Sequence, residues 1–374
     1  MRIGINLLAF KEEKTGLLTY GENLLECIGK IENKEQLFLF INQKFPSNLI
    51  FNYKNFHYIK TPINSYHKVK RALWEQFIFP FYLKKYKIDI LFNPTAFHPL
   101  FPLVKNITCV HSGGPLYFKL TSLSKLYLKF MYYTATKFSS QVITISNFAK
   151  KEILQKCKVP QKKIKVIHHG LPKLTMVDKK RQPIILTKFK IKTPYLFFIG
   201  GISQNKNIKN LVSAFKTLSK KYPNFNLVLS GKISPEFRDI KEFIKNSGLE
   251  KKIILTDIVD EEEKTTLYKN ALALIFPSFH EGFGLPVLEA QSLGIPVLTS
   301  NVTALPEVAG EGALFVGPYN VGEIAQGMEK IAFDKKLRED LIKKGYENIK
   351  RFSWEKTARE TLKVLKEAYY ENSL

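Results

Sequence analysis

The sequence predicts an α/β protein with two doubly wound domains that face each other across a cleft. Short runs of β-branched and aromatic residues alternate with helical patterns, which is typical of a parallel sheet covered by helices. This alternation occurs twice along the chain, on either side of a polar segment. With 374 residues, the chain is long enough for each half to bury its own core.

The first domain is expected over residues 1–171 and the second over residues 195–353, with a proline-bracketed, lysine-rich linker at 172–194. Because open α/β sheets bind ligands at the carboxyl ends of their strands, functional residues are expected there. A last helix over 354–374 has a regular apolar stripe. The predicted strands are 3–7, 37–41, 88–92, 107–110, 142–145 and 164–167, then 195–199, 226–229, 253–256, 272–276, 296–299 and 313–316.

Positive charge is concentrated in the first half of the chain. The net charge is +25, with 32 Lys+Arg against 10 Asp+Glu in residues 1–190, and 26 against 23 in residues 191–374. A basic domain beside a nearly neutral one indicates an anionic partner such as lipid headgroups, a phosphate-bearing acceptor or nucleic acid. The alternative explanation is a proteome rich in lysine, although such a bias would raise the lysine content of both halves of the chain.

Cysteine usage and hydropathy favour a cytoplasmic protein. The three cysteines, Cys27, Cys109 and Cys157, have neither metal-ligand nor disulfide-framework spacing, so a reducing compartment is expected. The apolar run at the start is too short for a signal peptide and is expected to be a strand. The longest apolar run, 77–83, contains a proline and is well short of the ~20 residues that span a bilayer, so any membrane contact is expected to be peripheral.

Residues 277–290 carry the most informative motif. Glu281 and Glu289 flank the bend Gly282, Phe283 and Gly284, between a predicted buried strand and a helix that begins near Leu285. Backbone N–H groups at such a helix start, together with the helix dipole, favour a phosphate-like anion.

This segment closely resembles the donor-site signature of the family 4 retaining glycosyltransferases, which have the GT-B fold of two Rossmann-like domains. The resemblance implies that Glu281 lies at the sugar and reaction centre, that Glu289 binds the ribose of the nucleotide, and that residues 282–285 bind the diphosphate. It also implies that the last helix, which begins after Phe352-Ser353, packs back on the first domain. Two solvated glutamates beside an ordinary turn would be the alternative for the motif taken alone.

A second glycine bend follows the predicted strand 195–199. Gly200 and Gly201 precede Lys206 and a helix, so this bend also suits an anion, with Lys206 supplying a full positive charge. The segment resembles the donor-phosphate loop of the family. Many relatives carry an arginine where this chain has Gly201 or Asn205, so neutralisation of the leaving diphosphate is expected to depend on Lys206 and backbone dipoles.

In the first domain, His111 follows the predicted strand 107–110 at its carboxyl end. The family has a His-Asp pair here whose histidine faces the sugar; this chain has Ser112 instead of the aspartate, which leaves His111 as the expected catalytic residue. Gly16 resembles part of the family's first glycine loop near the donor phosphate, although an ordinary turn is equally consistent. Ser146 is expected to cap a helix rather than to bind substrate.

Two further segments bear on the chemistry. The loop 300–308 resembles the family's loop beyond the donor helix, so Glu307 is expected to be structural. No Asp-x-Asp motif occurs; the resemblance therefore implies metal-independent transfer without a cofactor. A basic and aromatic helix is expected over 66–86, either lying at a membrane interface or packing Trp74 and Phe77 into the core with lysines outside.

The resemblance thus implies a retaining hexosyltransferase that uses a nucleotide-diphosphate sugar and a glycan or lipid-linked acceptor of polysaccharide or glycolipid synthesis. Similarity to the mannosyltransferase branch of the family favours GDP-mannose as the donor. The resemblance implies Lys206, Glu281 and His111 as its catalytic residues. The basic domain is expected to contact the inner face of a membrane that contains anionic lipids. Nucleic acid is not expected as a partner. A sugar-nucleotide epimerase, a nucleotide-sugar-binding protein without transfer activity and a basic nucleic-acid-binding protein are the alternatives.

Overall fold

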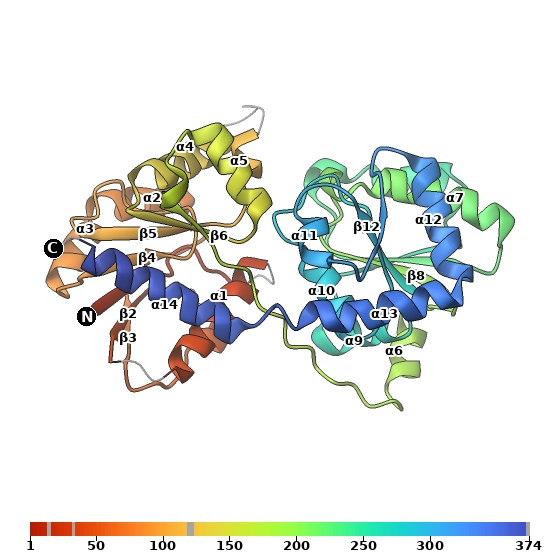
Figure 1. Cartoon of the computed structure of the whole chain (residues 1–374), viewed down its shortest axis with the longest axis horizontal. Coiled ribbons are helices and arrows are strands. Elements are labelled where there is room, and N and C mark those ends of the chain that lie inside the picture. Colours follow the sequence, from red (N-terminus) through yellow and green to blue (C-terminus); the bar gives the residue numbers. More distant parts are fainter. Residues whose placement is uncertain (13–15, 32–33, 118–122, 372–374) are drawn as a thin grey trace. The chain divides into compact units, whose positions relative to one another are not determined.

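The computed structural model describes residues 1–12, 16–31, 34–117 and 123–371. The chain divides into two compact units, one of Met1–Gly170 with Phe352–Leu374 and one of Leu171–Arg351. Each unit contains one parallel sheet, seven-stranded in the first and six-stranded in the second (Figure 1). The predicted pair of doubly wound domains is therefore confirmed.

The sheet of the first unit has the order β3-β2-β1-β4-β5-β6-β7. The order reverses between β1 and β4, and the carboxyl ends of the strands at such a reversal are where open α/β sheets usually place ligands. The strands are β1 (Arg2–Asn6), β2 (Gln36–Ile41), β3 (Phe56–Lys60), β4 (Ile90–Asn93), β5 (Lys105–Val110), β6 (Gln141–Thr144) and β7 (Ile164–Val166).

Helices cover both faces of this sheet. In Figure 1, α2 and α4 lie on one side of the strands, and α1 and α14 lie together on the other, as right-handed crossover connections require. The last helix, α14, is held to the first unit by Thr357, whose hydroxyl donates to the carbonyl of His168 (2.7 Å). The helices are α1 (Gly16–Lys30), α2 (Lys68–Phe77), α3 (Phe79–Lys85), α4 (Leu123–Phe138), α5 (Asn147–Cys157) and α14 (Trp354–Tyr370).

The sheet of the second unit has the order β10-β9-β8-β11-β12-β13, with its reversal between β8 and β11. Its strands are β8 (Tyr195–Ile199), β9 (Asn226–Ser230), β10 (Ile253–Asp257), β11 (Ala273–Phe276), β12 (Val297–Ser300) and β13 (Leu314–Val316). Its helices are α6 (Gln182–Lys188), α7 (Ile208–Lys221), α8 (Ile240–Asn246), α9 (Glu261–Lys269), α10 (Leu285–Ser292), α11 (Leu305–Ala309), α12 (Val321–Phe333) and α13 (Lys335–Ile349).

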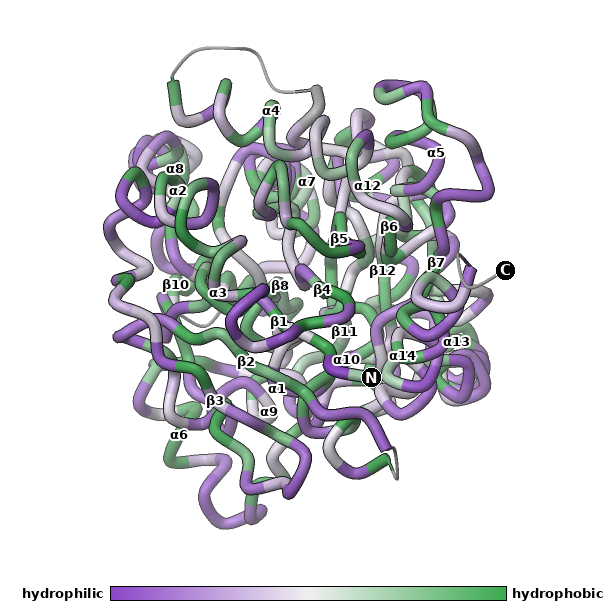
Figure 2. Tube along the Cα trace, turned by 90° about the vertical axis from the view of Figure 1, so that its left-hand side faces the viewer, coloured by the Kyte–Doolittle hydropathy of each residue, from purple (hydrophilic) through white to green (hydrophobic). Residues whose placement is uncertain are grey.

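The cores are formed by the central strands, which are hydrophobic on both faces. Ile3 of β1 pairs with Leu37 of β2 and Ile90 of β4, and all three side chains are fully buried. Figure 2 shows the corresponding hydrophobic colour along most of the strands. Continuous apolar runs of this kind are what a sheet covered on both faces requires.

Two segments differ from the sequence-based expectation. The helix expected over 66–86 is two helices, α2 and α3, because Pro80 lacks an N–H donor and its ring crowds the carbonyl four residues earlier. The segment 172–194, expected to be a linker, contains α6 and lies in the second unit, where Gln182 accepts a hydrogen bond from Asn270 (3.0 Å) beside α9.

This assignment also redistributes the charge. The first unit holds 30 Lys+Arg and 13 Asp+Glu, a net charge of +17, and the second holds 28 and 20, a net charge of +8. The asymmetry is smaller than the split at residue 190 indicated, because the lysine-rich segment 171–190 belongs to the second unit. The first unit is nonetheless the more basic one.

Candidate functional site

The candidate site of the second unit is formed where β8 and β11 end, at the reversal of the strand order. The segment after β11 bends at Gly284, which has a φ of +119° and begins α10. The positive φ favours glycine at this position, and a Cβ atom there would also lie 2.8 Å from a methyl group of Leu305, which would have to move. Pro286 lies in the first turn of α10, where its missing N–H group costs nothing.

The loop after β8 contains a close approach between two backbones. A Cβ atom on Gly231, at the end of β9, would lie 1.9 Å from the carbonyl oxygen of Gly200. The N–H of Gly200 donates to the carbonyl of Ser230 (3.0 Å), so it is not available to a ligand. Gly201 is exposed, and its N–H has no hydrogen-bond partner among the residues that the structure describes.

Asn207 joins the two loops. It has a left-handed backbone (φ 61°), begins α7 and is buried, and its side-chain amide donates to the carbonyls of Pro277 (2.9 Å) and Pro318 (2.6 Å). In addition, the N–H of Phe279 donates to the carbonyl of Asn205 (2.9 Å). The loop that carries Lys206 is therefore fixed against the loop that carries Glu281.

Lys206 and Glu281 form an ion pair within this joined structure. The Lys206 Nζ lies 2.5 Å from Glu281 Oε1, and the two side chains are 18% and 12% exposed. The Lys206 ammonium also lies 5.3 Å from the ring centroid of Phe276, the last residue of β11. This arrangement holds a cation and a carboxylate in a largely desolvated position, where each interacts strongly with a charged ligand.

Glu289, on α10, is buried and has both carboxylate oxygens engaged. Oε1 accepts from Lys264 Nζ (3.1 Å), and Oε2 accepts from the Tyr268 hydroxyl (2.8 Å). Burial raises the pKa of Tyr268, and the adjacent Glu289 carboxylate raises it further. Burial lowers the pKa of Lys264, but Glu289 and Glu261 outweigh this effect, so the pKa is raised overall and the lysine is charged.

The sequence reasoning did not identify Lys264 and Tyr268. Both lie on α9, four residues apart and therefore on one helix face. The helix start is marked in the sequence by a capping box between Asp260 and Glu263. That signal fixes the register of α9, but contact with Glu289 depends on tertiary packing.

The remaining predicted residues of this segment lie between Glu281 and the first turn of α10. Phe283 is buried, and Gly282 and Leu285 are half-buried at the start of α10. Ala304 donates its N–H to the carbonyl of Glu281 (3.4 Å) just before α11. Glu307, in α11, accepts from Arg351 Nη2 through its backbone carbonyl (3.3 Å).

His111 lies in the first unit, directly after β5. Its Nε2 lies 2.8 Å from the carbonyl oxygen of Pro94. Because a carbonyl can only accept, Nε2 carries the proton, and Nδ1 of the neutral ring is an acceptor. Burial lowers the pKa of His111, and the bond to Pro94 only partly opposes this.

His111 contacts an aromatic cluster that the sequence did not predict. Tyr20 meets the His111 ring edge-on at 4.7 Å and stacks on His169 at 4.9 Å. His169 in turn stacks on Trp354 at 5.3 Å. Burial lowers the pKa of His169 well below the usual value, helped by His111.

The two other predictions in the first unit have different outcomes. Gly16 is the exposed first residue of α1, and a Cβ atom there would meet nothing within 4 Å among the described residues; Thr15, next to it, lies outside them. Ser146 caps α5 by accepting from the N–H of Ala149 (3.0 Å), which confirms the expected cap.

Neither a cluster of metal-binding side chains nor a membrane-spanning helix occurs in the part of the chain that the structure describes. No group of three or more His, Cys, Asp or Glu side chains within the described residues is arranged to hold a metal ion. Within the same residues, every helix is too short or too polar to pass through a lipid bilayer.

Comparison with known families gives two matches along the chain. The family described as "Glycosyl transferases group 1" matches residues 182–348, and the one described as "Glycosyltransferase Family 4" matches residues 42–172. Among curated relatives, O-antigen chain mannosyltransferase B of Escherichia coli is 31% identical over 231 residues, covering 60% of each chain. O-antigen chain mannosyltransferase RfbU of Salmonella typhimurium is 29% identical over 222 residues, covering 59% of each chain. These matches thus span about 60% of the length of the relatives.

Solved structures with the same fold cover nearly the whole chain. HepE of Anabaena, solved with UDP and glucose, aligns with a TM-score of 0.75 at 16% identity over 98% of this chain and 99% of that one. WaaG, a glycosyltransferase involved in lipopolysaccharide biosynthesis, aligns with a TM-score of 0.74 at 13% identity over 97% and 99%. At these identities the likeness establishes the fold, which is the GT-B fold expected from the sequence.

Proposed function

The chain belongs to glycosyltransferase family 4, and we propose that it transfers a hexosyl unit from a nucleotide-diphosphate sugar to a glycan or lipid-linked acceptor. One observation carries this proposal: Asn207 joins two glycine-bearing loops at the carboxyl ends of β8 and β11, with the Lys206–Glu281 pair between them. A diphosphate needs such a set of fixed positive charge and backbone dipoles.

In the proposed reaction, Lys206 and the start of α10 stabilise the charge that develops on the leaving diphosphate. Glu281, which holds the ammonium at 2.5 Å, fixes its position and lies beside the sugar. Groups placed in this way before the reaction stabilise the transition state without reorganising. Glu289, fixed by Lys264 and Tyr268, has lone pairs left to accept from ribose hydroxyls.

The bond changes follow the retaining chemistry that the family resemblance implies. The acceptor oxygen bonds to the anomeric carbon on the face from which the diphosphate departs, the bond between that carbon and the phosphate oxygen breaks, and the acceptor proton passes to the leaving phosphate. His111 presents the unprotonated Nδ1 of a neutral ring, which suits acceptance of a hydrogen bond from a sugar hydroxyl. The reaction is proposed to need no metal ion.

The donor proposed is GDP-mannose. The printed names of relatives from Escherichia coli and Salmonella typhimurium describe O-antigen mannosyltransferases, which supports a mannosyl donor and a polysaccharide product. HepE was solved with UDP and glucose, so the donor test includes uridine nucleotides.

The proposal is tested by measuring thermal unfolding and nucleoside-diphosphate release with UDP-, GDP- and ADP-sugars. The true donor raises the unfolding temperature by mass action and gives release that depends on an acceptor. Binding of one nucleotide sugar without any release or transfer would instead favour a binding protein without transfer activity. No binding of any nucleotide sugar would refute the proposed site.

A further inference from the structure

Helix α2 buries two charged residues and exposes three large apolar ones, the opposite of what is usual for a surface helix. Arg71 and Glu75 are buried, whereas Val69, Leu73 and Phe77 are 73%, 55% and 66% exposed. Residues two apart on a helix lie about 200° apart, so the charged pair points inward and the apolar residues point outward. The core packing that the sequence offered as one alternative is observed in part, because Trp74 packs on Phe79 and Tyr82 whereas Phe77 is exposed.

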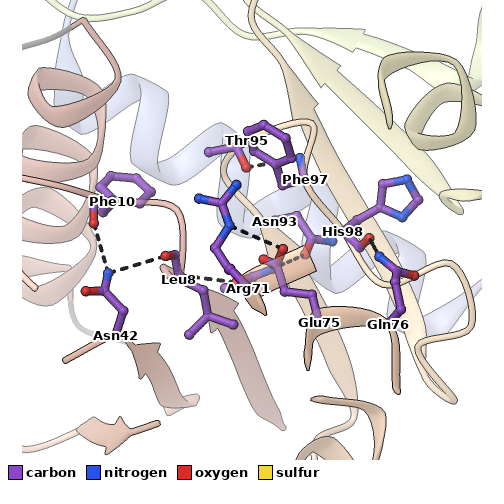
Figure 3. A network of polar contacts seen from close by, with 11 residues as sticks. Leu8, Phe10, Asn42, Arg71, Glu75, Gln76, Asn93, Thr95, Phe97 and His98 are labelled. Carbon is purple, nitrogen blue, oxygen red and sulfur yellow. Dashed lines mark hydrogen bonds and ion pairs between the residues drawn. The ribbon is translucent and has the colours of Figure 1, made fainter. Parts of the chain in front are cut away.

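A buried polar network fixes this orientation (Figure 3). Glu75 accepts from Asn6 (3.3 Å), at the end of β1, and Asn6 also donates to Asn93 (3.1 Å), at the end of β4. Arg71 Nε lies 3.6 Å from Glu75 Oε2, and the Arg71 guanidinium lies 4.7 Å from the ring centroid of Phe97. Turning the helix over would expose Arg71 and Glu75 and would remove Glu75 as an acceptor for the buried amide of Asn6, so the apolar stripe faces outward.

The exposed apolar residues continue beyond α2. The segment 97–100 lies between α2 and α4, because Gln76 bonds to the backbone of His98 and Leu100 (2.9 and 2.8 Å), and His98 contacts Thr134 of α4 (3.2 Å). Further exposed apolar side chains lie on α3, on this segment and on one stripe of α4: Phe81 65%, Phe101 79%, Leu103 65%, Leu123 85%, Leu126 48%, Phe130 47% and Tyr133 44%.

Positive charge accompanies these residues without any exposed negative charge. Helices α2, α3 and α4 contain a single acidic residue, the buried Glu75. Their lysines are Lys68, Lys70, Lys84, Lys85, Lys125, Lys129 and Lys137. We call this combined surface of α2, α3, segment 97–103 and α4 the apolar-basic face.

We propose that the apolar-basic face docks on the surface of a membrane that contains anionic lipids. At such a surface the exposed apolar side chains would enter the boundary between headgroups and acyl chains, and the lysines would lie among the anionic headgroups. A second copy of the chain would bring lysines against lysines in a two-fold contact. Nucleic acid would use the lysines but would leave Leu73, Phe77 and Phe81 in water.

The test is co-sedimentation of the full chain with vesicles of phosphatidylcholine alone or mixed with an equal amount of phosphatidylglycerol. We expect binding to the mixed vesicles that weakens as salt is added. Leu73→Ser/Phe77→Ser and Leu126→Ser/Phe130→Ser should each weaken binding by about tenfold or more, because two partly inserted apolar side chains are lost. Lys84→Glu/Lys85→Glu should weaken binding to the mixed vesicles alone.

The matched control is Met176→Ser/Ile184→Ser, which removes two side chains of similar exposure (73% and 69%) from the second unit and should not change binding. Thermal unfolding checks that every variant is folded. The proposal would be overturned if Leu73→Ser/Phe77→Ser and Leu126→Ser/Phe130→Ser, which we call the stripe variants, bound vesicles as well as the control does. Salt-sensitive retention on DNA without vesicle binding would also overturn it, as would a dimer in solution that the stripe variants dissociate. Because no donor is present, failure here leaves the proposed transfer reaction untouched.

Discussion

Replacing Lys206 with alanine separates the proposed catalytic role of this lysine from the structural role of its ion pair with Glu281. Two unit charges 2.5 Å apart attract each other by about 7 kcal/mol at an effective dielectric constant of about 20. Desolvation offsets much of this, and the side chains are 18% and 12% exposed. We therefore expect the truncation to cost about 2–3 kcal/mol, which would lower the unfolding temperature of the second unit by about 5–10 °C.

The expected catalytic loss exceeds this structural effect. Removal of one preorganised cation from the leaving group should lower turnover by about 10²-fold or more, measured as the initial rate of nucleoside-diphosphate release at a temperature where the variant is folded. Lys209→Ala is the control, because Lys209 pairs with Asp239 at the same 2.5 Å on the surface and should cost at most about 1 kcal/mol with no loss of turnover.

A double variant supplies the decisive comparison. In Lys206→Ala/Glu281→Gln no unpaired carboxylate remains, so most of the lost stability should return, whereas turnover should stay low. Near-normal turnover in either Lys206→Ala or the double variant would refute the assigned role of the lysine.

Four further outcomes follow from the site. Tyr268→Phe removes a 2.8 Å bond to Glu289, so the donor KM should rise about tenfold with little change in kcat; an unchanged KM would show that this carboxylate does not bind the donor. Gly231→Ala, whose Cβ would lie 1.9 Å from a carbonyl oxygen, should cost more than about 3 kcal/mol in chemical unfolding, whereas Gly201→Ala should be close to neutral; equal effects would contradict the close approach. Because burial lowers the pKa of His169, the unfolded state binds more protons below the usual value of 6.5, so stability is complete above this pH and should decrease as the pH falls below it; a pH titration of unfolding checks the sign, and a Phe substitution should reduce the slope. Addition of EDTA should leave transfer unchanged, and loss of activity restored by a divalent ion would refute metal independence.

The sequence predicted most strands and both glycine bends because these depend on local patterns. Alternating apolar runs and helical stripes identify the central strands, since they are buried on both faces. The edge strand β3 was missed: its residues 57–59 are only half-buried and it pairs with β2 alone, so its pattern is weak. Helix α6 was missed because it has only seven residues, and its three consecutive aliphatic residues, 184–186, do not form a helical stripe; only Ile185 is buried.

Contacts between distant segments explain what the sequence did not reveal about the site. Asn207 and Tyr268 act on partners 70 and 21 residues away, respectively. Gly16 was singled out as part of a motif, whereas the tightly packed glycines of α1 are Gly21 and Gly29. A Cβ atom at either position would lie 2.1 Å from an aromatic ring, that of Phe10 or of Tyr53, respectively. Local spacing cannot distinguish these cases, because the close neighbour lies elsewhere in the chain.

The amide of Asn207 has a consequence for the speed of ligand capture. It binds two carbonyls from separate loops, so the atoms that we propose to bind the diphosphate already hold their relative positions before any nucleotide arrives. No ordering step should therefore slow association, and the entropy lost on binding should come from the nucleotide rather than from the polypeptide. Asn207→Ala should consequently slow association itself, in addition to hastening release.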